Sequence, residues 1–143
     1  MTTDLTGCQT SRPFRVLVAE DNHIVRHAIE CFMKDAGVSV QSSVDGQDAL
    51  QRWLEDPSGY DALITDHQMP RMTGLELVRE IRAHAVSGMD LKVIVHSGCL
   101  GAADISDYLA FQVECILQKP CLPQNLIDAV LVARKSSLWP RAK

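Results

Sequence analysis

The stretch Phe14-Arg15-Val16-Leu17-Val18-Ala19-Glu20-Asp21-Asn22 sets the pattern that the rest of the chain repeats. A short apolar run ends at an acidic pair, and from Asn22 onward apolar residues recur at helical spacing until Gly37. The residues with this spacing are Val25, Ala28, Ile29, Phe32 and Met33. We therefore predict a buried strand that leads directly into an amphipathic helix.

Four more units of the same kind follow along the chain. Strand-like runs occupy residues 38–40, 62–65, 91–95 and 115–117, and a helical pattern follows each of them. Asp45 is a predicted N-cap, Thr73 and Glu76 fit a capping box, and Pro123 suits the first turn of the last helix. Residues 102–110 form the fourth predicted helix. Strand–helix alternation of this kind favours a parallel sheet with helices on both faces.

Composition limits the class of protein. The chain has 143 residues, of which 46% are hydrophobic and 22% charged, with a formal net charge of −4. The high hydrophobic content and modest net charge argue against a disordered chain. The excess of acidic over basic residues argues against binding to a nucleic-acid backbone. No apolar run approaches the roughly 18 residues that a membrane span needs. We expect one domain over residues 13–135, with tails at 1–12 and 136–143.

The cysteines and the N-terminus indicate the compartment. The first twelve residues lack the apolar stretch of a secretory signal, and none of the cysteines forms a C-x-x-C motif. We expect reduced thiols in the cytoplasm, without a zinc or redox centre. The five cysteines are Cys8, Cys31, Cys99, Cys115 and Cys121.

Chemically active side chains collect where the predicted strands end. In an open parallel sheet, ligands bind beyond the carboxyl ends of the strands, and these ends carry Glu20, Asp21, Asp66, Ser97 and Lys119. Three adjacent carboxylates repel one another unless a cation lies among them, and oxygen ligands favour Mg²⁺. The set predicts an aspartate that accepts a phosphoryl group, with Mg²⁺ and a lysine neutralising the phosphoryl oxygens.

At these positions the sequence resembles the receiver domain of two-component response regulators, over about residues 14–133. The resemblance depends on several motifs in a fixed order at the strand ends, and none of them is specific by itself. The motifs are Val16-Leu17-Val18-Ala19-Glu20-Asp21-Asn22, Val44-Asp45-Gly46-Gln47-Asp48-Ala49-Leu50, Asp66-His67-Gln68-Met69-Pro70-Arg71-Met72-Thr73-Gly74, Val95-His96-Ser97-Gly98 and Lys119-Pro120.

The resemblance implies a fold and a site. The fold is α/β and flavodoxin-like, a doubly wound five-stranded parallel sheet in the order 2-1-3-4-5 with five surrounding helices. Asp66 would be the phosphoacceptor, Ser97 the switch hydroxyl and Lys119 a phosphoryl contact, often followed by a cis bond to proline. Mg²⁺, or Mn²⁺ in its place, would be held by Glu20, Asp21, Asp66 and the backbone carbonyl of Gln68.

The resemblance also implies partners. The phosphoryl donor would be a histidine on a sensor kinase or on a histidine phosphotransfer protein, and the motifs look most like receivers of hybrid sensor kinases. A downstream protein would read the surface made by the fourth helix, fifth strand and fifth helix, residues 102–133. Self-dephosphorylation would be tuned by Gln68 and Cys99. No direct contact with nucleic acid or membrane is expected, and the fold would leave no residues for an effector module.

Two other functions remain open. The family usually has an aromatic residue where this chain has Ile116, which leaves room for a receiver-like adaptor that binds partners without phosphorylation. A phosphohydrolase of the haloacid dehalogenase type also uses an aspartyl phosphate, but it requires a second aspartate where this chain has Gln68.

The remaining histidines and tryptophans have structural interpretations. His23 and His27 lie one helical turn apart and are expected on a solvated face, not at a metal. His67 is expected at the rim of the site and His96 as a satisfied core histidine. Trp53 is predicted to pack in the core, and Trp139 lies in the predicted tail.

Overall fold

A five-stranded parallel sheet forms the centre of the protein. The computed structural model describes residues 13–84 and 90–138, with side chains to residue 135. The strands are β1 (Arg15–Ala19), β2 (Ser39–Ser43), β3 (Ala62–Thr65), β4 (Lys92–Ser97) and β5 (Cys115–Gln118), and their order is β2-β1-β3-β4-β5. From β1 the sheet grows outward in both directions, so the topological switch point lies between β1 and β3.

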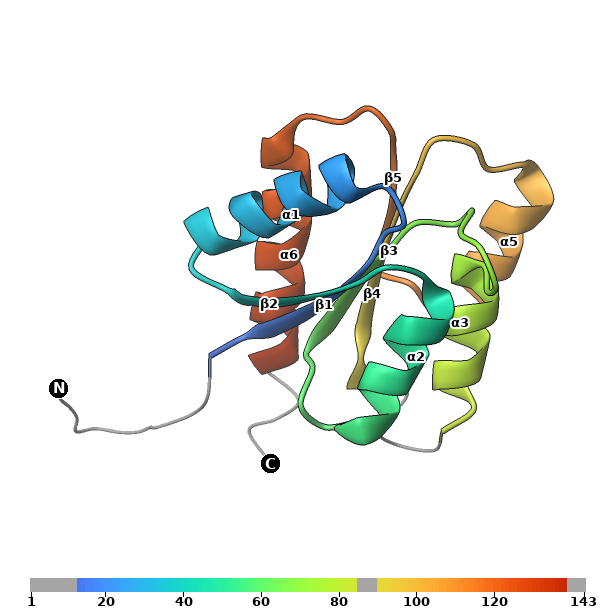
Figure 1. The fold of residues 1–143 in the computed structure, drawn as a ribbon, viewed down its shortest axis with the longest axis horizontal. Coiled ribbons are helices and arrows are strands. Elements are labelled where there is room, and N and C mark those ends of the chain that lie inside the picture. The colour runs from blue at the N-terminus through green and yellow to red at the C-terminus, as the bar shows by residue number, and fades with distance from the viewer. Residues whose placement is uncertain (1–12, 85–89, 139–143) are drawn as a thin grey trace, which may run out of the picture.

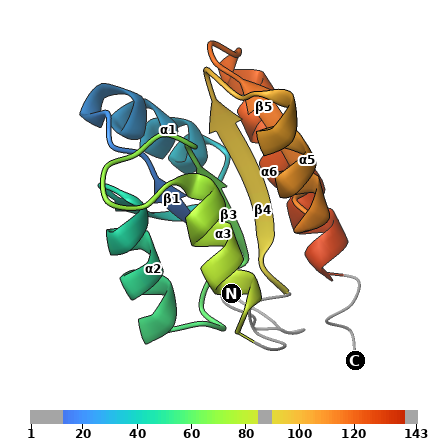
Figure 2. The same ribbon diagram turned by 90° about the vertical axis from the view of Figure 1, so that its right-hand side faces the viewer.

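Helices cover both faces of this sheet. Helices α1 (His23–Asp35) and α6 (Pro123–Leu138) lie on one face, and α2 (Gly46–Glu55), α3 (Gly74–Arg82) and α5 (Ala102–Ala110) lie on the other (Figures 1 and 2). This doubly wound α/β arrangement confirms the predicted fold class and strand order. Among the described helices, none is both long enough and apolar enough to cross a bilayer.

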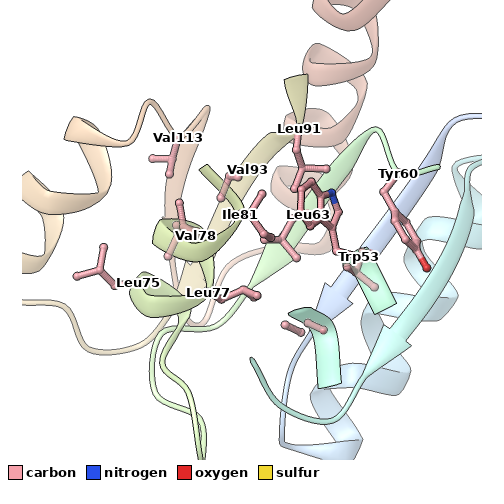
Figure 3. Packing of buried hydrophobic residues seen from close by; sticks show 14 of the residues in the cluster. Trp53, Tyr60, Leu63, Leu75, Leu77, Val78, Ile81, Leu91, Val93 and Val113 are labelled. Carbon is pink, nitrogen blue, oxygen red and sulfur yellow. The ribbon is translucent and has the colours of Figure 1, made fainter. Parts of the chain in front are cut away.

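The core consists of two apolar layers, one on each face of the sheet. Alternate residues of one strand point to opposite faces, so Leu17 belongs to the layer under α2, α3 and α5, whereas Val16 and Val18 belong to the layer under α1 and α6. Trp53 is fully buried in the first layer, as predicted, and Figure 3 shows it near Leu63. Burial on both faces explains why the central strands read as continuous apolar runs.

Local sequence signals account for several helix ends. The Asp45 carboxylate accepts a hydrogen bond from the Asp48 backbone N–H at 2.8 Å, and the Thr73–Glu76 capping box is formed, both as predicted. Gly37 follows α1 with a φ of 77°, a conformation that glycine adopts without steric cost.

Two strands extend two or more residues beyond their predicted ends. The second strand covers Ser39–Ser43 and not 38–40, and the fourth reaches Ser97. Strand β2 lies at the edge of the sheet and is only partly buried. Most of its residues are polar, so the sequence shows little of the apolar pattern from which strand ends are predicted. Its length is set by pairing with β1, where Arg15 lies opposite Ser39 and Ala19 opposite Ser43.

The predicted tails are only partly described. Helix α6 continues through Leu138, three residues into the segment predicted as the C-terminal tail. Residues 1–12 and 139–143, which include Cys8 and Trp139, lie outside the described residues. The four described cysteines are free thiols.

His96 corrects one expectation. The residue is buried near the end of β4, as predicted, but its Nδ1 has no hydrogen-bond partner in the described part of the chain, so it is not a satisfied core histidine. The position of His96 in an apolar strand indicated that its side chain is buried. Whether another group reaches its Nδ1 depends on the tertiary structure, which the sequence does not show. Burial lowers the pKa of His96, and the positive charge of Lys119 adds to this effect.

The lowered pKa of His96 predicts a pH dependence of stability. Above the ordinary histidine pKa of 6.5 the imidazole is neutral in both states; below it, the unfolded chain binds the proton more tightly. The free energy of unfolding should therefore fall as the pH is lowered through that value, by at most about 1.4 kcal/mol per pH unit. Urea unfolding at about pH 7.5 and about pH 5.5 measures the fall. The His96→Leu variant should show a smaller fall than the parent, and equal falls would contradict the assignment.

Candidate functional site

Three carboxylates meet at the carboxyl ends of β1 and β3. Glu20 and Asp21 directly follow β1, and Asp66 directly follows β3. The two strands pair in parallel with Ala19 opposite Thr65, so the residues after them lie side by side. Carboxylate oxygens of all three residues lie within 4.8 Å of one another, with Glu20 and Asp66 buried and Asp21 exposed.

Backbone hydrogen bonds fix the two buried carboxylates. The Asp66 N–H donates to the carbonyl of Ala19 at 3.0 Å, which continues the sheet pairing past the end of β3. The N–H of His67 donates to Asp66 Oδ1 at 2.7 Å, and the N–H of Asn22 donates to Glu20 Oε2 at 3.2 Å. The acidic groups are therefore positioned in advance by main-chain donors.

Lys119, which follows the edge strand β5, adds a positively charged side chain to the three carboxylates. Its Nζ donates to Glu20 Oε1 and to Asp66 Oδ2, both at 3.0 Å. Its backbone N–H donates to the carbonyl of Ser97 at 2.9 Å, and the Lys119–Pro120 peptide bond is cis. A residue that follows β5 thus reaches carboxylates that follow β1 and β3.

The site has more acidic than basic side chains, and burial and hydrogen bonds shift the pKa values of Glu20 and Lys119. Burial raises the pKa of Glu20, and the nearby Asp66 charge adds to this, although the hydrogen bond from Lys119 opposes it. Burial alone would lower the pKa of Lys119, but its hydrogen bonds to Glu20 and Asp66 outweigh burial and raise it. The lysine therefore remains an ammonium ion. One ammonium beside three carboxylates leaves negative charge that a cation can offset.

This donor set fits a small divalent cation. Within the described residues, Glu20, Asp21 and Asp66 are the one group of His, Cys, Asp and Glu side chains close enough together to hold a metal. All three offer oxygen atoms, the ligands that Mg²⁺ and Mn²⁺ prefer, and exposure of Asp21 leaves access for water. The exposed His23 and His27 belong to no such group, in line with their expected place on a solvated face.

Ser97 and Gln68 lie at the same end of the sheet. Ser97 is buried at the last position of β4, and its carbonyl is bonded to the Lys119 N–H. Gln68 is exposed in the loop two residues after Asp66. The switch role of Ser97 and the carbonyl-ligand role of Gln68 stay predictions. Ile116 is partly buried and packs against the core layer under α2, α3 and α5.

Sequence reasoning missed the anchor of the loop that follows Asp66. The Arg71 guanidinium donates to Asp45 Oδ2 from Nε at 2.9 Å and approaches it from Nη2 at 2.7 Å. Burial alone would raise the pKa of Asp45, but the Asp48 N–H and Arg71 outweigh it and lower it. Arg71 has a φ of 70°, unusual for a residue with a side chain. Asp45 therefore both caps α2 and holds this loop.

Two further contacts were also missed. Arg26, one turn into α1, donates to the carbonyl of Glu20 at 2.8 Å and of Asp21 at 3.4 Å. His67 does more than lie at the rim, because its Nδ1 lies 2.7 Å from the hydroxyl of Tyr108. Helical spacing could have placed Arg26 near Asn22, but no sequence signal joins residues 67 and 108.

Comparison with known proteins identifies the family of this chain. A family model described as the response regulator receiver domain matches residues 16–131. The chain is 32% identical over 133 residues to the Regulator of RpoS of Escherichia coli K12, covering 93% of this chain and 36% of that protein. It is 33% identical over 98 residues to the response regulator sskA of Aspergillus fumigatus, covering 68% of this chain and 11% of that protein. The chain therefore spans about a third or less of these relatives.

Solved structures show the same fold. A response regulator receiver protein from Pseudomonas putida superposes with a TM-score of 0.76 at 28% identity, covering 85% of this chain and 98% of that one. The signal receiver domain of a putative Luxo repressor protein from Vibrio parahaemolyticus gives a TM-score of 0.82 at 23% identity, covering 92% and 97%. With its five strands in the order 2-1-3-4-5 and its acidic rim, this chain belongs to the response regulator receiver domain family.

Proposed function

We propose that this domain accepts a phosphoryl group on the carboxylate of Asp66 from a phosphohistidine on a partner protein. The observation that carries the proposal is the placement of a buried aspartate between an ammonium 3.0 Å away and two further carboxylates with oxygens within 4.8 Å. Such an arrangement provides a nucleophile, a fixed positive charge and ligands for a cation at one point. Membership of the receiver family supports the same reaction.

The transfer step follows from these groups. A carboxylate oxygen of Asp66 forms a bond to phosphorus while the bond between phosphorus and the imidazole nitrogen of the donor breaks. The electron pair of the broken bond stays on that nitrogen, and the product on Asp66 is an acyl phosphate. Lys119, already 3.0 Å from Asp66 Oδ2, neutralises charge on the phosphoryl oxygens.

A divalent cation would contribute to the same charge balance. Glu20, Asp21, Asp66 and the backbone carbonyl of Gln68 would hold Mg²⁺, and Mn²⁺ would serve in its place. When bound, the cation supplies positive charge to the phosphoryl oxygens. Buried Glu20, whose pKa is raised in the absence of a cation, would be more stable as a carboxylate beside one.

After transfer, the same site would control the signal. Ser97 would pair its hydroxyl with the new phosphoryl group, and water would later hydrolyse the acyl phosphate. Gln68 and Cys99 are exposed in the loops after Asp66 and Ser97, where side chains can hinder or orient that water. This self-hydrolysis ends the signal and needs no separate substrate.

An apolar groove lies next to Lys119, the residue whose Nζ binds Asp66, and could receive the phosphoryl donor. A cavity of about 280 Å³ lies between α1 and the segment after β5, and Lys119 forms part of its wall. Ile24 and Leu122, both largely exposed, line this groove. A donor that covers these apolar side chains would bring its histidine to the acidic rim. We propose this face for the histidine kinase or histidine phosphotransfer protein.

A second surface suits the downstream protein. Helix α5 exposes Ile105 and Leu109 one turn apart, and α6 exposes Leu131 and Val132. These two helices and β5 form the region predicted at residues 102–133 for output. Phosphorylation would shift an existing equilibrium between two arrangements of this surface.

Replacement of Asp66 tests the acceptor role. The Asp66→Asn variant keeps the size of the side chain but loses the nucleophilic carboxylate, so we expect no stable phosphorylation. Incubation with acetyl phosphate and Mg²⁺, followed by intact-protein mass spectrometry, measures the added phosphoryl group. Asp35→Asn, an exposed change of equal charge at the end of α1, should be phosphorylated like the parent.

Two outcomes would contradict the proposal. Equal phosphorylation of Asp66→Asn and parent would show that another residue is the acceptor. Equal binding of a partner protein by phosphorylated parent, unphosphorylated parent and Asp66→Asn would favour an adaptor that works without phosphorylation, a function for which the aliphatic Ile116 leaves room.

Removal of Asp21 tests the cation site independently of phosphorylation. Asp21 is the exposed member of the acidic group, so Asp21→Asn should disturb folding little while it removes one charged ligand. We expect Mn²⁺ affinity to fall by roughly tenfold or more. Titration of free Mn²⁺ by electron paramagnetic resonance measures this, with Asp35→Asn as the control. Unchanged affinity in Asp21→Asn would place the cation elsewhere.

A further inference from the structure

Tyr108 is the only buried residue of α5. Its side chain is fully buried, and its hydroxyl lies 2.7 Å from Nδ1 of His67. The two rings also pack edge to face, with 5.6 Å between their centroids. The contact joins α5 to the loop after β3, across 41 residues of sequence.

The same histidine contacts the proposed phosphoacceptor. Its backbone N–H donates to Asp66 Oδ1 at 2.7 Å, and its carbonyl accepts from the N–H of Gly74 at 2.8 Å. His67 therefore binds the Asp66 carboxylate through its main chain and Tyr108 through its ring. A change at Asp66 that moves the main chain of His67 also moves its ring.

The surroundings leave little space to absorb such a movement. A Cβ added at Gly74 would lie 2.1 Å from the carbonyl oxygen of Asp66 and 2.7 Å from the Tyr108 hydroxyl. Only glycine allows the acceptor backbone, the start of α3 and Tyr108 to meet this closely. In a region packed to this degree, a displaced group transmits its displacement to its neighbours.

The chemistry of the hydroxyl favours one direction for the hydrogen bond. Burial raises the pKa of Tyr108, and the charges of Asp104 and Asp66 add to this, so the hydroxyl stays protonated and can donate. With His67 Nδ1 as the acceptor, Nε2 carries the ring proton and faces Asp104 Oδ2 at 3.7 Å. Asp104 lies in the first turn of α5, so the imidazole contacts this helix at two points.

We propose that the hydrogen bond between His67 and Tyr108 couples the phosphorylation state of Asp66 to the position of α5. The inference rests on the proposed function, because it requires a phosphoryl group on Asp66. The bond holds α5 in its present position while Asp66 is a free carboxylate. Phosphorylation removes the carboxylate charge that the His67 N–H pairs with and adds a dianionic group beside it, so His67 shifts and the bond to Tyr108 breaks.

Release of α5 has a consequence at the surface. The exposed side of this helix carries Ile105 and Leu109, whereas Tyr108 anchors its buried side. When the anchor is released, the two apolar side chains move relative to β5 and α6. Tyr108 is thus a positioning residue for the output surface and takes no part in phosphoryl transfer.

A pair of tyrosine variants tests the coupling. Tyr108→Phe removes only the hydroxyl and keeps the buried ring. Tyr60→Phe is the matched control, because the Tyr60 hydroxyl is also bonded, at 2.8 Å to Gln41 Oε1, in a contact between the approach to β3 and the edge strand β2. These are the two tyrosines of the chain. Amide hydrogen exchange over residues 102–110 is measured with and without acetyl phosphate and Mg²⁺, and is normalised to the phosphorylated fraction found by mass spectrometry.

We expect Tyr108→Phe, but not Tyr60→Phe, to lose the change in α5 amide exchange that follows phosphorylation. In the parent and in Tyr60→Phe, phosphorylation should speed exchange in α5. In unphosphorylated Tyr108→Phe, exchange should already be faster by about threefold to tenfold, the factor that one ordinary hydrogen bond represents, and phosphorylation should add little. A response in Tyr108→Phe equal to the parent's, or an equal loss in Tyr60→Phe, would overturn the inference.

A double variant separates this bond from general destabilisation. His67→Ala removes the other partner, and if both residues act through one hydrogen bond, the double variant should lose no more of the α5 response than either single variant. Additive losses would overturn the inference. A phosphorylated parent with no change in α5 exchange would overturn this inference alone, whereas a parent that takes up no phosphoryl group would overturn the proposed function as well.

Discussion

The contact of the Lys119 ammonium with Glu20 and Asp66 is the interaction on which the site depends. Three carboxylates at one sheet edge repel one another, and two of them are buried, where water screens little of that repulsion. One lysine donates to both buried carboxylates at 3.0 Å and remains charged because of them. The remaining negative charge explains why the site suits a cation and, with it, a phosphoryl group.

This contact requires the parallel sheet to have its particular strand order. Glu20 follows β1, Asp66 follows β3 and Lys119 follows β5, and these strands end at the same edge with β4 between the last two. Main-chain pairing past the strand ends, from Asp66 to Ala19 and from Lys119 to Ser97, sets the positions of the side chains. Burial of the strands in two apolar layers thereby holds the polar groups in place.

Much of the fold and the strand-end positions of the candidate site residues could be predicted because their signals are local. Apolar periodicity located the strands and helices, and cap residues such as Asp45 and Thr73 located helix starts. The partner of Arg71, the lack of a partner for His96 Nδ1 among the described residues, and the bond between His67 and Tyr108 could not be predicted in this way. Each depends on which residues meet across the sheet or between loops, and the spacing within one segment carries no information about that.

By itself, the sequence determined the class of fold, the strand-end positions of the acidic residues and of Lys119, and thus the chemistry that this edge can support. Only the tertiary structure decided how those groups pair, because hydrogen-bond distances depend on strand order and on the twist of the sheet. It also decided that the loop after Asp66 is held by Asp45 and contacts α5 through Tyr108. Such contacts arise from close packing of segments distant in sequence, and packing is a property of the assembled molecule.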